Sequence, residues 1–140
     1  MRFMILRMAD AKTEAGVLPD QKVLAAMGKY MEDMQKAGIL LGGEGLKPTS
    51  QGSRVQFSGG KPRVIDGPFT EVKELIGGYT MIEVRSKEEA VEWARRWPPI
   101  DGDVVLEIRQ LFEADDFGPE FTPELREAEE RMRSRIAGKP

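Results

Sequence analysis

The order of apolar segments along the chain constrains its fold more than any other feature of the sequence. Residues 3–8 are mostly apolar, with arginine near both ends, and this predicts a buried strand. A helix is predicted from Pro19 and Asp20 to Gly38, because glycine commonly follows a helix end. Its apolar residues recur at helical spacing: Val23, Leu24, Met27, Tyr30, Met31 and Met34. Residues 39–41 then predict a second strand.

The middle of the chain predicts a β-hairpin. Residues 54–58 alternate, with Val55 and Phe57 on one face, and residues 63–65 form the returning strand. Gly59-Gly60 between them is a two-residue hairpin turn. The following Asp66-Gly67-Pro68-Phe69 has the composition of a further turn.

The next part of the chain returns to a strand, a helix and a strand. Residues 79–84 predict a strand, and Ser86 with Glu89 forms a capping box at the start of a helix that Pro98-Pro99 ends. Residues 104–110 predict the last strand. This order predicts an α+β fold, a ferredoxin-like split βαβ sheet with both helices on one face and an inserted hairpin. The other sheet face needs a cover, and a second copy of the same sheet would supply one, so we expect a homodimer.

Residues 113–140 differ in character from residues 1–112, and we expect them to form a separate extension. An acidic connector leads to Thr122-Pro123, a favourable start for a helix. The helix has a weak apolar stripe of Leu125, Ala128, Met132 and Ile136. This helix can pack on its own domain or a partner subunit, or it can dock on another protein, and disorder is the third alternative.

The chain contains neither cysteine nor histidine. This composition excludes disulfides, thiolate nucleophiles, histidine bases and the usual zinc ligands. Proton chemistry would therefore need carboxylates, lysine, tyrosine or the substrate itself. We expect no metal site and no cofactor.

The net charge of −3 is small for 140 residues. A nucleic-acid surface would need a strong basic excess, so we expect no nucleic-acid partner. No apolar run approaches the roughly 20 residues of a membrane helix, and the N-terminal segment has no signal-peptide pattern. We therefore expect no membrane partner and a cytoplasmic location.

Residues 66–74, followed by Gly77-Gly78-Tyr79, resemble the DGPF (DGPFAETKE) signature of the YCII-related family. Thr70 and Val72 replace the commoner alanine and threonine. The glycine-rich segment 42–46 with Pro48, and the helix that contains Trp97, are similar to segments of the same family. The resemblance covers residues 1 to about 112. It implies a dimeric α+β barrel with a small-molecule cleft between sheet and helices. It also implies an association with sigma factors of the extracytoplasmic-function class. Better-studied relatives have a histidine–aspartate pair in the cleft, which this chain cannot complete.

Two carboxylates are the candidate catalytic residues. Asp66 opens the signature and can serve as a base if its pKa is raised, or it can form a turn by accepting backbone hydrogen bonds. Glu71 shares a face of a short helical turn with Glu74, so the two can form a carboxylate pair or an exposed charged turn.

Four further residues are candidates for ligand binding: Arg7, Glu44, Lys73 and Tyr79. Each also has a structural alternative. Arg7 can form an ion pair with Glu44, Glu83 or Glu107, and Glu44 can lie exposed on a bulged strand. Lys73 can be a surface lysine, and Tyr79 a strand tyrosine whose hydroxyl is satisfied.

Three functions stay open at this point. The first is a small-molecule site, catalytic or purely binding, for which we expect Asp66, Glu71, Tyr79 and Arg7 to converge on a pocket. The second is an accessory protein that binds a partner such as a sigma factor. The third is a structural dimer without a ligand.

Overall fold

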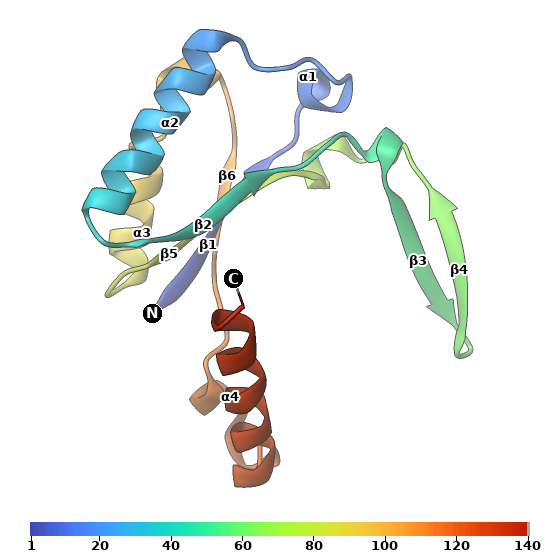
Figure 1. The fold of residues 1–140 in the computed structure, drawn as a ribbon. Coiled ribbons are helices and arrows are strands. Elements are labelled where there is room, and N and C mark those ends of the chain that lie inside the picture. The colour runs from blue at the N-terminus through green and yellow to red at the C-terminus, as the bar shows by residue number, and fades with distance from the viewer. Residues whose placement is uncertain (140) are drawn as a thin grey trace. The chain divides into compact units, whose positions relative to one another are not determined.

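A computed structural model of the chain describes residues 1–139. Its contacts divide the chain into two compact units, Met1–Gln110 (unit 1) and Leu111–Pro140 (unit 2). Figure 1 shows the path of the chain. The two units are described separately below.

Unit 1 is built on a four-stranded antiparallel sheet. Its strands are β1 (Arg2–Met8), β2 (Leu40–Gly45), β5 (Ile76–Glu83) and β6 (Leu106–Gln110), in the order β2-β5-β1-β6. The two strands that follow a helix, β2 and β6, lie at the edges, as in a ferredoxin-like split βαβ sheet. The predicted α+β fold class is confirmed.

Helices α2 (Gln21–Lys36) and α3 (Lys87–Ala94) lie together on one face of this sheet (Figure 1). The side chains of Asp20 and Ser86 cap them by accepting hydrogen bonds from backbone N–H groups, as the sequence predicted. Between the helices and the sheet lies the core: Phe3, Ile5, Tyr30, Met34, Ile39, Ile82, Val84, Ala90 and Ala94.

The opposite face of the sheet also carries large apolar side chains. Because side chains alternate along a strand, Met4, Leu6 and Met8 of β1 share this face with Tyr79 and Met81 of β5. We call it the open face, since α2 and α3 lie on the other side.

The inserted hairpin is present as predicted. Strands β3 (Ser53–Ser58) and β4 (Lys61–Asp66) form their own two-stranded sheet. Gly59 and Gly60 connect them with φ angles of 58° and 78°, which residues other than glycine rarely adopt. Figure 1 shows the hairpin as an arm that leaves the four-stranded sheet and extends away from α2 and α3.

Short helices connect the main elements of unit 1. They are α1 (Ala11–Glu14) and the 3₁₀ turns η1 (Thr49–Gln51), η2 (Val72–Glu74) and η3 (Pro99–Asp101). The small and polar residues of segment 10–16 predict a loop. In the structure, Asp10 and Thr13 form a reciprocal capping box that stabilises the single turn of α1.

Unit 2 contains the turn η4 (Ala114–Glu120) and helix α4 (Pro123–Ala137). The Thr122 side chain caps α4, so the predicted C-terminal helix is confirmed. The rings of Phe112, Phe117 and Phe121 pack in sequence, with centroids 5.0 and 5.6 Å apart.

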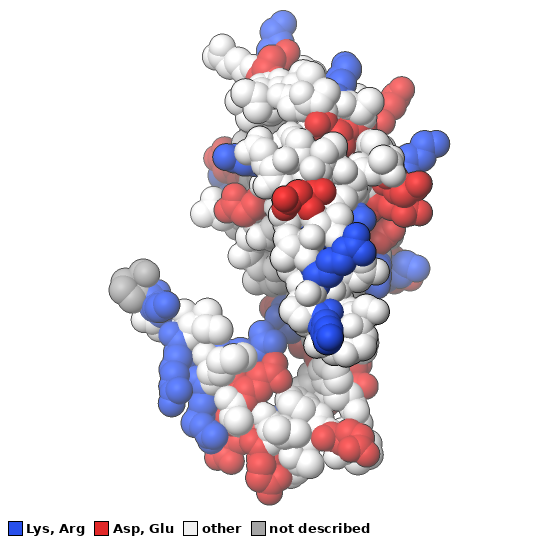
Figure 2. Space-filling view, turned by 90° about the vertical axis from the view of Figure 1, so that its right-hand side faces the viewer, with Lys and Arg blue, Asp and Glu red and all other residues white. Residues whose placement is uncertain are grey.

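The distribution of surface charge and the hydropathy of the helices are relevant to nucleic-acid and membrane partners. Figure 2 shows acidic and basic side chains interspersed with uncharged areas over the visible surface. Within residues 1–139, no helix is both long and apolar enough to span a bilayer.

Candidate functional site

A cleft of about 910 Å³ opens in unit 1 between the N-terminal half of α2 and one end of the sheet. Helix α1, the segment from Gly16 to Asp20 and the turn η3 complete its border. Its volume lies within the range of about 300–1,000 Å³ that small-molecule sites commonly have. The cleft is therefore the candidate functional site.

Apolar side chains form most of the wall. Val23, Met27 and Met31 line it from α2, and they belong to the helical stripe seen in the sequence. Five large apolar side chains at the mouth are 48–85% exposed: Val17, Leu18, Leu24, Leu46 and Ile100. Single exposed apolar residues are ordinary, but a group of them around one cleft is typical of a binding site.

The close pairing of β2 with β5 at the cleft depends on Gly43. A Cβ atom there would lie 2.9 Å from the Tyr79 carbonyl oxygen and 3.2 Å from Thr80 Cα, both in the β5 backbone, and 3.1 Å from Met31 Cε of α2. The methionine tip can rotate away, but the backbone cannot, so any larger residue would disturb the β2–β5 pairing beside the cleft. The glycine-rich segment 42–45 thus has a packing role at this position.

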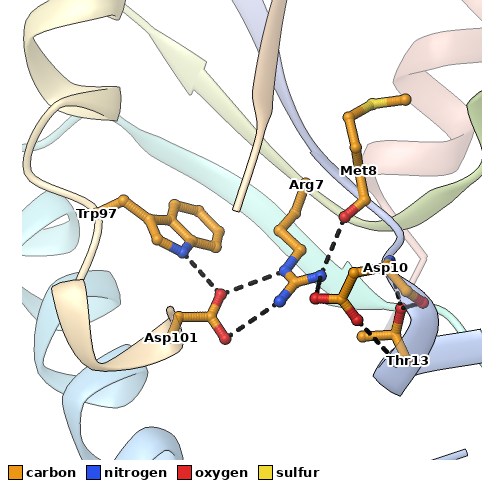
Figure 3. A network of polar contacts seen from close by, with 6 residues as sticks. All are labelled: Arg7, Met8, Asp10, Thr13, Trp97 and Asp101. Carbon is orange, nitrogen blue, oxygen red and sulfur yellow. Dashed lines mark hydrogen bonds and ion pairs between the residues drawn. The ribbon is translucent and has the colours of Figure 1, made fainter. Parts of the chain in front are cut away.

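Arg7 lines the cleft and is the centre of a polar network (Figure 3). We call Arg7, Asp10 and Asp101 the floor of the cleft. Its guanidinium donates to both oxygens of Asp101, from Nε at 3.2 Å and from Nη2 at 3.3 Å. Its Nη1 donates to the Met8 carbonyl at 3.0 Å and to Asp10 Oδ2 at 3.3 Å. The indole Nε1 of Trp97 also donates to Asp101, at 2.9 Å. This network joins β1, the N-cap of α1, the segment after α3 and η3.

Asp10 serves this network and the capping of α1 together. Its Oδ1 accepts from the Thr13 backbone N–H at 2.9 Å, while its Oδ2 accepts from Arg7. The hydrogen bond from Thr13 lowers the pKa of Asp10 below its ordinary value, the Arg7 charge lowers it further, and burial offsets part of the change.

The floor carries one positive side chain, Arg7, and two negative ones, Asp10 and Asp101. Its formal charge is −1 when all three are ionised. Four of the five N–H groups of Arg7 are used by the bonds above. The floor can therefore donate about one further hydrogen bond from this guanidinium. It offers an incoming anion no unpaired cation.

The structure brings three of the six predicted site residues to the cleft: Arg7, Glu44 and Tyr79. Glu44 and Tyr79 face each other in register on β2 and β5. Because side chains alternate, Thr80 is turned toward the helices and Tyr79 toward the open face. Thr80, rather than Tyr79, therefore offers its hydroxyl to the helix side of the sheet.

Asp66, Glu71 and Lys73 do not line the cleft. Asp66 lies at the end of β4, where its Oδ1 accepts from the Ser53 hydroxyl at 2.7 Å. Glu71 and Lys73 are exposed beside η2. The expected convergence of Asp66, Glu71, Tyr79 and Arg7 on one pocket is not found. The hairpin and η2 hold Asp66 and Glu71 outside the cleft, and the Tyr79 side chain is turned toward the open face.

The segment from Asp66 to Phe69 closes the base of the hairpin instead. The Gly67 N–H donates to the Gly52 carbonyl at 2.9 Å, and a Cβ on Gly67 would overlap the carbonyl oxygen of Thr49. The Phe69 N–H donates to Thr49 Oγ1 at 3.0 Å. The glycine and the turn after it thus allow two chain segments to cross in close contact.

This hairpin base is also tied to the border of the cleft. The carboxylate of Glu14 in α1 accepts two hydrogen bonds from Thr49, one from the hydroxyl at 2.6 Å and one from the backbone N–H at 3.1 Å. The guanidinium of Arg54 lies 3.8 Å above the centroid of the Phe69 ring. The signature segment therefore fixes the arm relative to α1.

The chain matches the YCII-related domain over residues 1–115. It belongs to the YCII-related family. An uncharacterised protein of Rhizobium meliloti (strain 1021), R00369, is 33% identical over 76 residues, which span 54% of this chain and 61% of that protein.

A likeness to one solved structure has a TM-score of 0.46 at 15% sequence identity and covers 81% of this chain and 95% of the other. That protein is the 5-chloro-2-hydroxyhydroquinone dehydrochlorinase of Burkholderia phenoliruptrix AC1100, in a complex with 2,5-dihydroxybenzoquinone. The predicted association with sigma factors is not tested by these likenesses and stays a prediction.

Sequence reasoning missed the partners of Arg7 in this YCII-related protein. We considered Glu44, Glu83 and Glu107, whereas the structure pairs Arg7 with Asp10 and Asp101. The composition around Asp101, after Pro98-Pro99 and before Gly102, predicts only a turn. Its position four residues after Trp97 gives no local signal of a contact with β1. The sequence also allows Arg109, at the end of the last strand, to pair with the same glutamates, and it does pair with Glu107 at 3.4 Å.

Proposed function

We propose that unit 1 binds a small molecule with a largely apolar body, uncharged or cationic, in the cleft between α2 and the sheet. The group of exposed apolar side chains at the mouth supports this proposal most directly. Covering such side chains with a ligand is favourable by roughly 25 cal/mol for each Å² of apolar surface removed from water.

The charge of the ligand follows from the floor. The charged residues along the whole cleft are three bases and four acids, so its formal charge is also −1: Arg7, Lys12, Lys47, Asp10, Asp20, Glu44 and Asp101. An anion would approach a site of this charge, and it would have to displace Asp101 or Asp10 to reach Arg7. An uncharged ligand with one acceptor oxygen can use the remaining N–H of Arg7 without breaking the network. The ligand we propose therefore carries an acceptor at its buried end.

We propose that the cleft binds a ligand, and we assign no reaction to it. The two carboxylates of the floor already accept hydrogen bonds. Asp101 accepts from Arg7 and Trp97, and Asp10 accepts from Thr13. The chain has no histidine to move a proton near neutral pH.

We also propose that the protein is a homodimer in which a second copy covers the open face. Leaving Met4, Met8 and Met81 partly exposed on a sheet face is unfavourable, and a second sheet is an apolar cover of the same size. Membership of the DGPF subgroup and a cytoplasmic location are part of the same proposal.

A thermal-shift screen with uncharged aromatic fragments tests the binding site. Met27→Trp should fill the cleft, whereas Gln35→Trp on the exposed side of α2 adds the same bulk outside it. We expect fragments that raise the Tm of the wild type and of Gln35→Trp but leave that of Met27→Trp unchanged. If no fragment separates these variants, the proposed site is wrong.

Native mass spectrometry of the gently purified protein tests the assembly at the same time. A wild-type dimer supports the second copy on the open face. A monomer at all concentrations contradicts that part of the proposal and leaves the fragment result to be judged alone.

A further inference from the structure

The hairpin arm has one apolar face, and this face is exposed. Val55 pairs with Val64 and Phe57 with Pro62 across the strands, so these four side chains point the same way. Val55, Phe57 and Val64 are 55%, 70% and 66% exposed. Gln56, Ser58 and Ile65 lie on the other face, together with the three basic residues of the hairpin: Arg54, Lys61 and Arg63. The pair Ser53 and Asp66 ends the apolar face at the base of the arm.

A two-stranded hairpin with an uncovered apolar face is marginally stable in water. The arm is nevertheless fixed at its base, where Gly67 packs on Thr49, and the Thr49 side chain is bonded to both Phe69 and Glu14. These contacts fix the base of the arm against η1 and α1, and the apolar face stays exposed within unit 1. A cover for this face would therefore come from outside unit 1.

Charge favours a second copy of the chain as that cover. Residues 53–66 carry three bases and one acid, a formal charge of +2, although the whole chain carries −3. Residues 111–140 carry −3, so the part of unit 1 outside the hairpin carries −2. Glu44, Glu83 and Glu107 are exposed on the open face of its sheet. A basic arm is attracted to the acidic body of a second copy.

We propose that the β3–β4 arm packs the face formed by Val55, Phe57, Pro62 and Val64 against a second copy of the chain. This inference rests on the proposed dimer and assigns its specificity to the inserted hairpin. In a two-fold dimer each copy gives one arm and receives one, so both apolar faces are covered by one symmetric contact.

Nucleic acid is a less suitable occupant for this face. Phe57 is the only aromatic residue of the hairpin, and stacking sites for single strands use several aromatic rings within a basic groove. The arm presents its bases on the face opposite to Phe57.

A triple substitution tests the arm. Val55→Thr, Phe57→Thr and Val64→Thr keep residues that favour strands but remove the apolar face. Gln56→Thr with Ser58→Thr is the matched control on the opposite face. Because two arms contribute to each dimer, we expect the triple variant to raise the dimer dissociation constant roughly 100-fold or more. The dimer dissociation constant of the control should stay within about threefold of the wild-type value.

The outcomes separate the arm from the dimer. A wild-type monomer overturns both the proposed dimer and the arm contact. A dimer whose dissociation constant is equal in the wild type and the triple variant overturns the arm contact alone. Circular dichroism of the triple variant shows whether the main sheet and helices remain folded.

Site-specific cross-linking gives a second test that does not depend on stability. The chain has no cysteine, so Phe57→Cys introduces a unique thiol for a benzophenone maleimide. Mixed ¹⁴N- and ¹⁵N-labelled copies distinguish cross-links between copies from those within one. We expect cross-links between copies that reach residues of unit 1. Cross-links confined to one copy, or to nucleic acid retained during purification, overturn the proposal.

Discussion

The guanidinium of Arg7 on β1 binds both carboxylate oxygens of Asp101, 94 residues further along the chain. The two side chains are only 12% and 16% exposed. Asp101 also accepts the indole N–H of Trp97, so one carboxylate connects the first strand to the end of α3. The floor of the cleft is thus held in place before any ligand arrives.

Removing one partner of this ion pair should be costly. Arg7→Met leaves Asp10 and Asp101 without their cation in a partly buried site, and we expect it to lower the free energy of unfolding by roughly 3 kcal/mol. Arg7→Lys keeps the charge but loses the two-point geometry, so we expect an intermediate loss. Urea denaturation at pH 7 measures both.

Arg109→Met is the matched control for that substitution. Arg109 pairs with Glu107 at 72% and 48% exposure, and exposed pairs contribute about 0–1 kcal/mol. Equal losses for Arg7→Met and Arg109→Met would show that the network at the cleft floor has no special role in stability.

Gly67 is predicted to be irreplaceable for a steric reason. A methyl group there overlaps the Thr49 carbonyl oxygen, and this oxygen belongs to the main chain and cannot rotate away. We expect Gly67→Ala to destabilise unit 1 by roughly 1–3 kcal/mol or more.

The matched substitution is Gly28→Ala in α2. No atom lies within 4 Å of a Cβ atom placed there, and alanine favours helices over glycine by about 0.5–1 kcal/mol. Thermal denaturation should therefore move in opposite directions for the two variants. A stable Gly67→Ala protein would contradict the close crossing at the hairpin base.

Tyr30 should make stability depend on alkaline pH. Burial raises its pKa to about 12 from an ordinary 10.0, and the charge of Arg96 offsets part of the rise. Because the folded state favours the neutral phenol, this contribution is fully present below pH 10 and is lost as the pH rises towards 12.

The comparison with Tyr30→Phe isolates this effect. The Tyr30 hydroxyl donates to the Trp93 carbonyl at 2.6 Å, so the variant should lose about 1 kcal/mol near neutral pH. The difference between wild type and variant should shrink between pH 10 and 12. A difference that stays constant over this interval contradicts the assignment.

The sequence predicted the elements well where the signal was local. Helix α2 was expected from its apolar spacing and its Asp20 cap, and the hairpin from Gly59-Gly60 between alternating strands. The one-turn helix α1 was missed because its capping box joins Asp10 to a threonine, whereas the usual pattern ends in glutamate or glutamine.

The candidate site was less predictable because its contacts are distant in sequence. Arg7 was recognised as a candidate, but Asp101 reaches it only after the whole sheet has formed. The signature residues Asp66 and Glu71 drew attention as carboxylates, whereas Gly67 and Phe69 are the residues whose contacts define that segment. A turn sequence does not reveal which distant backbone it crosses.

The indole N–H resonance of Trp97 gives the most direct test of ligand binding in the cleft. Trp97 lines the cleft, and Trp93→Phe leaves its indole signal as the only one in a ¹⁵N spectrum. The protein is titrated at pH 7 with uncharged aromatic fragments, each paired with its carboxylate analogue. We expect uncharged fragments to shift the Trp97 signal at concentrations where their carboxylate analogues leave it unchanged. A Trp97 signal that no fragment moves, or that the carboxylates move more strongly, would contradict the proposed ligand binding.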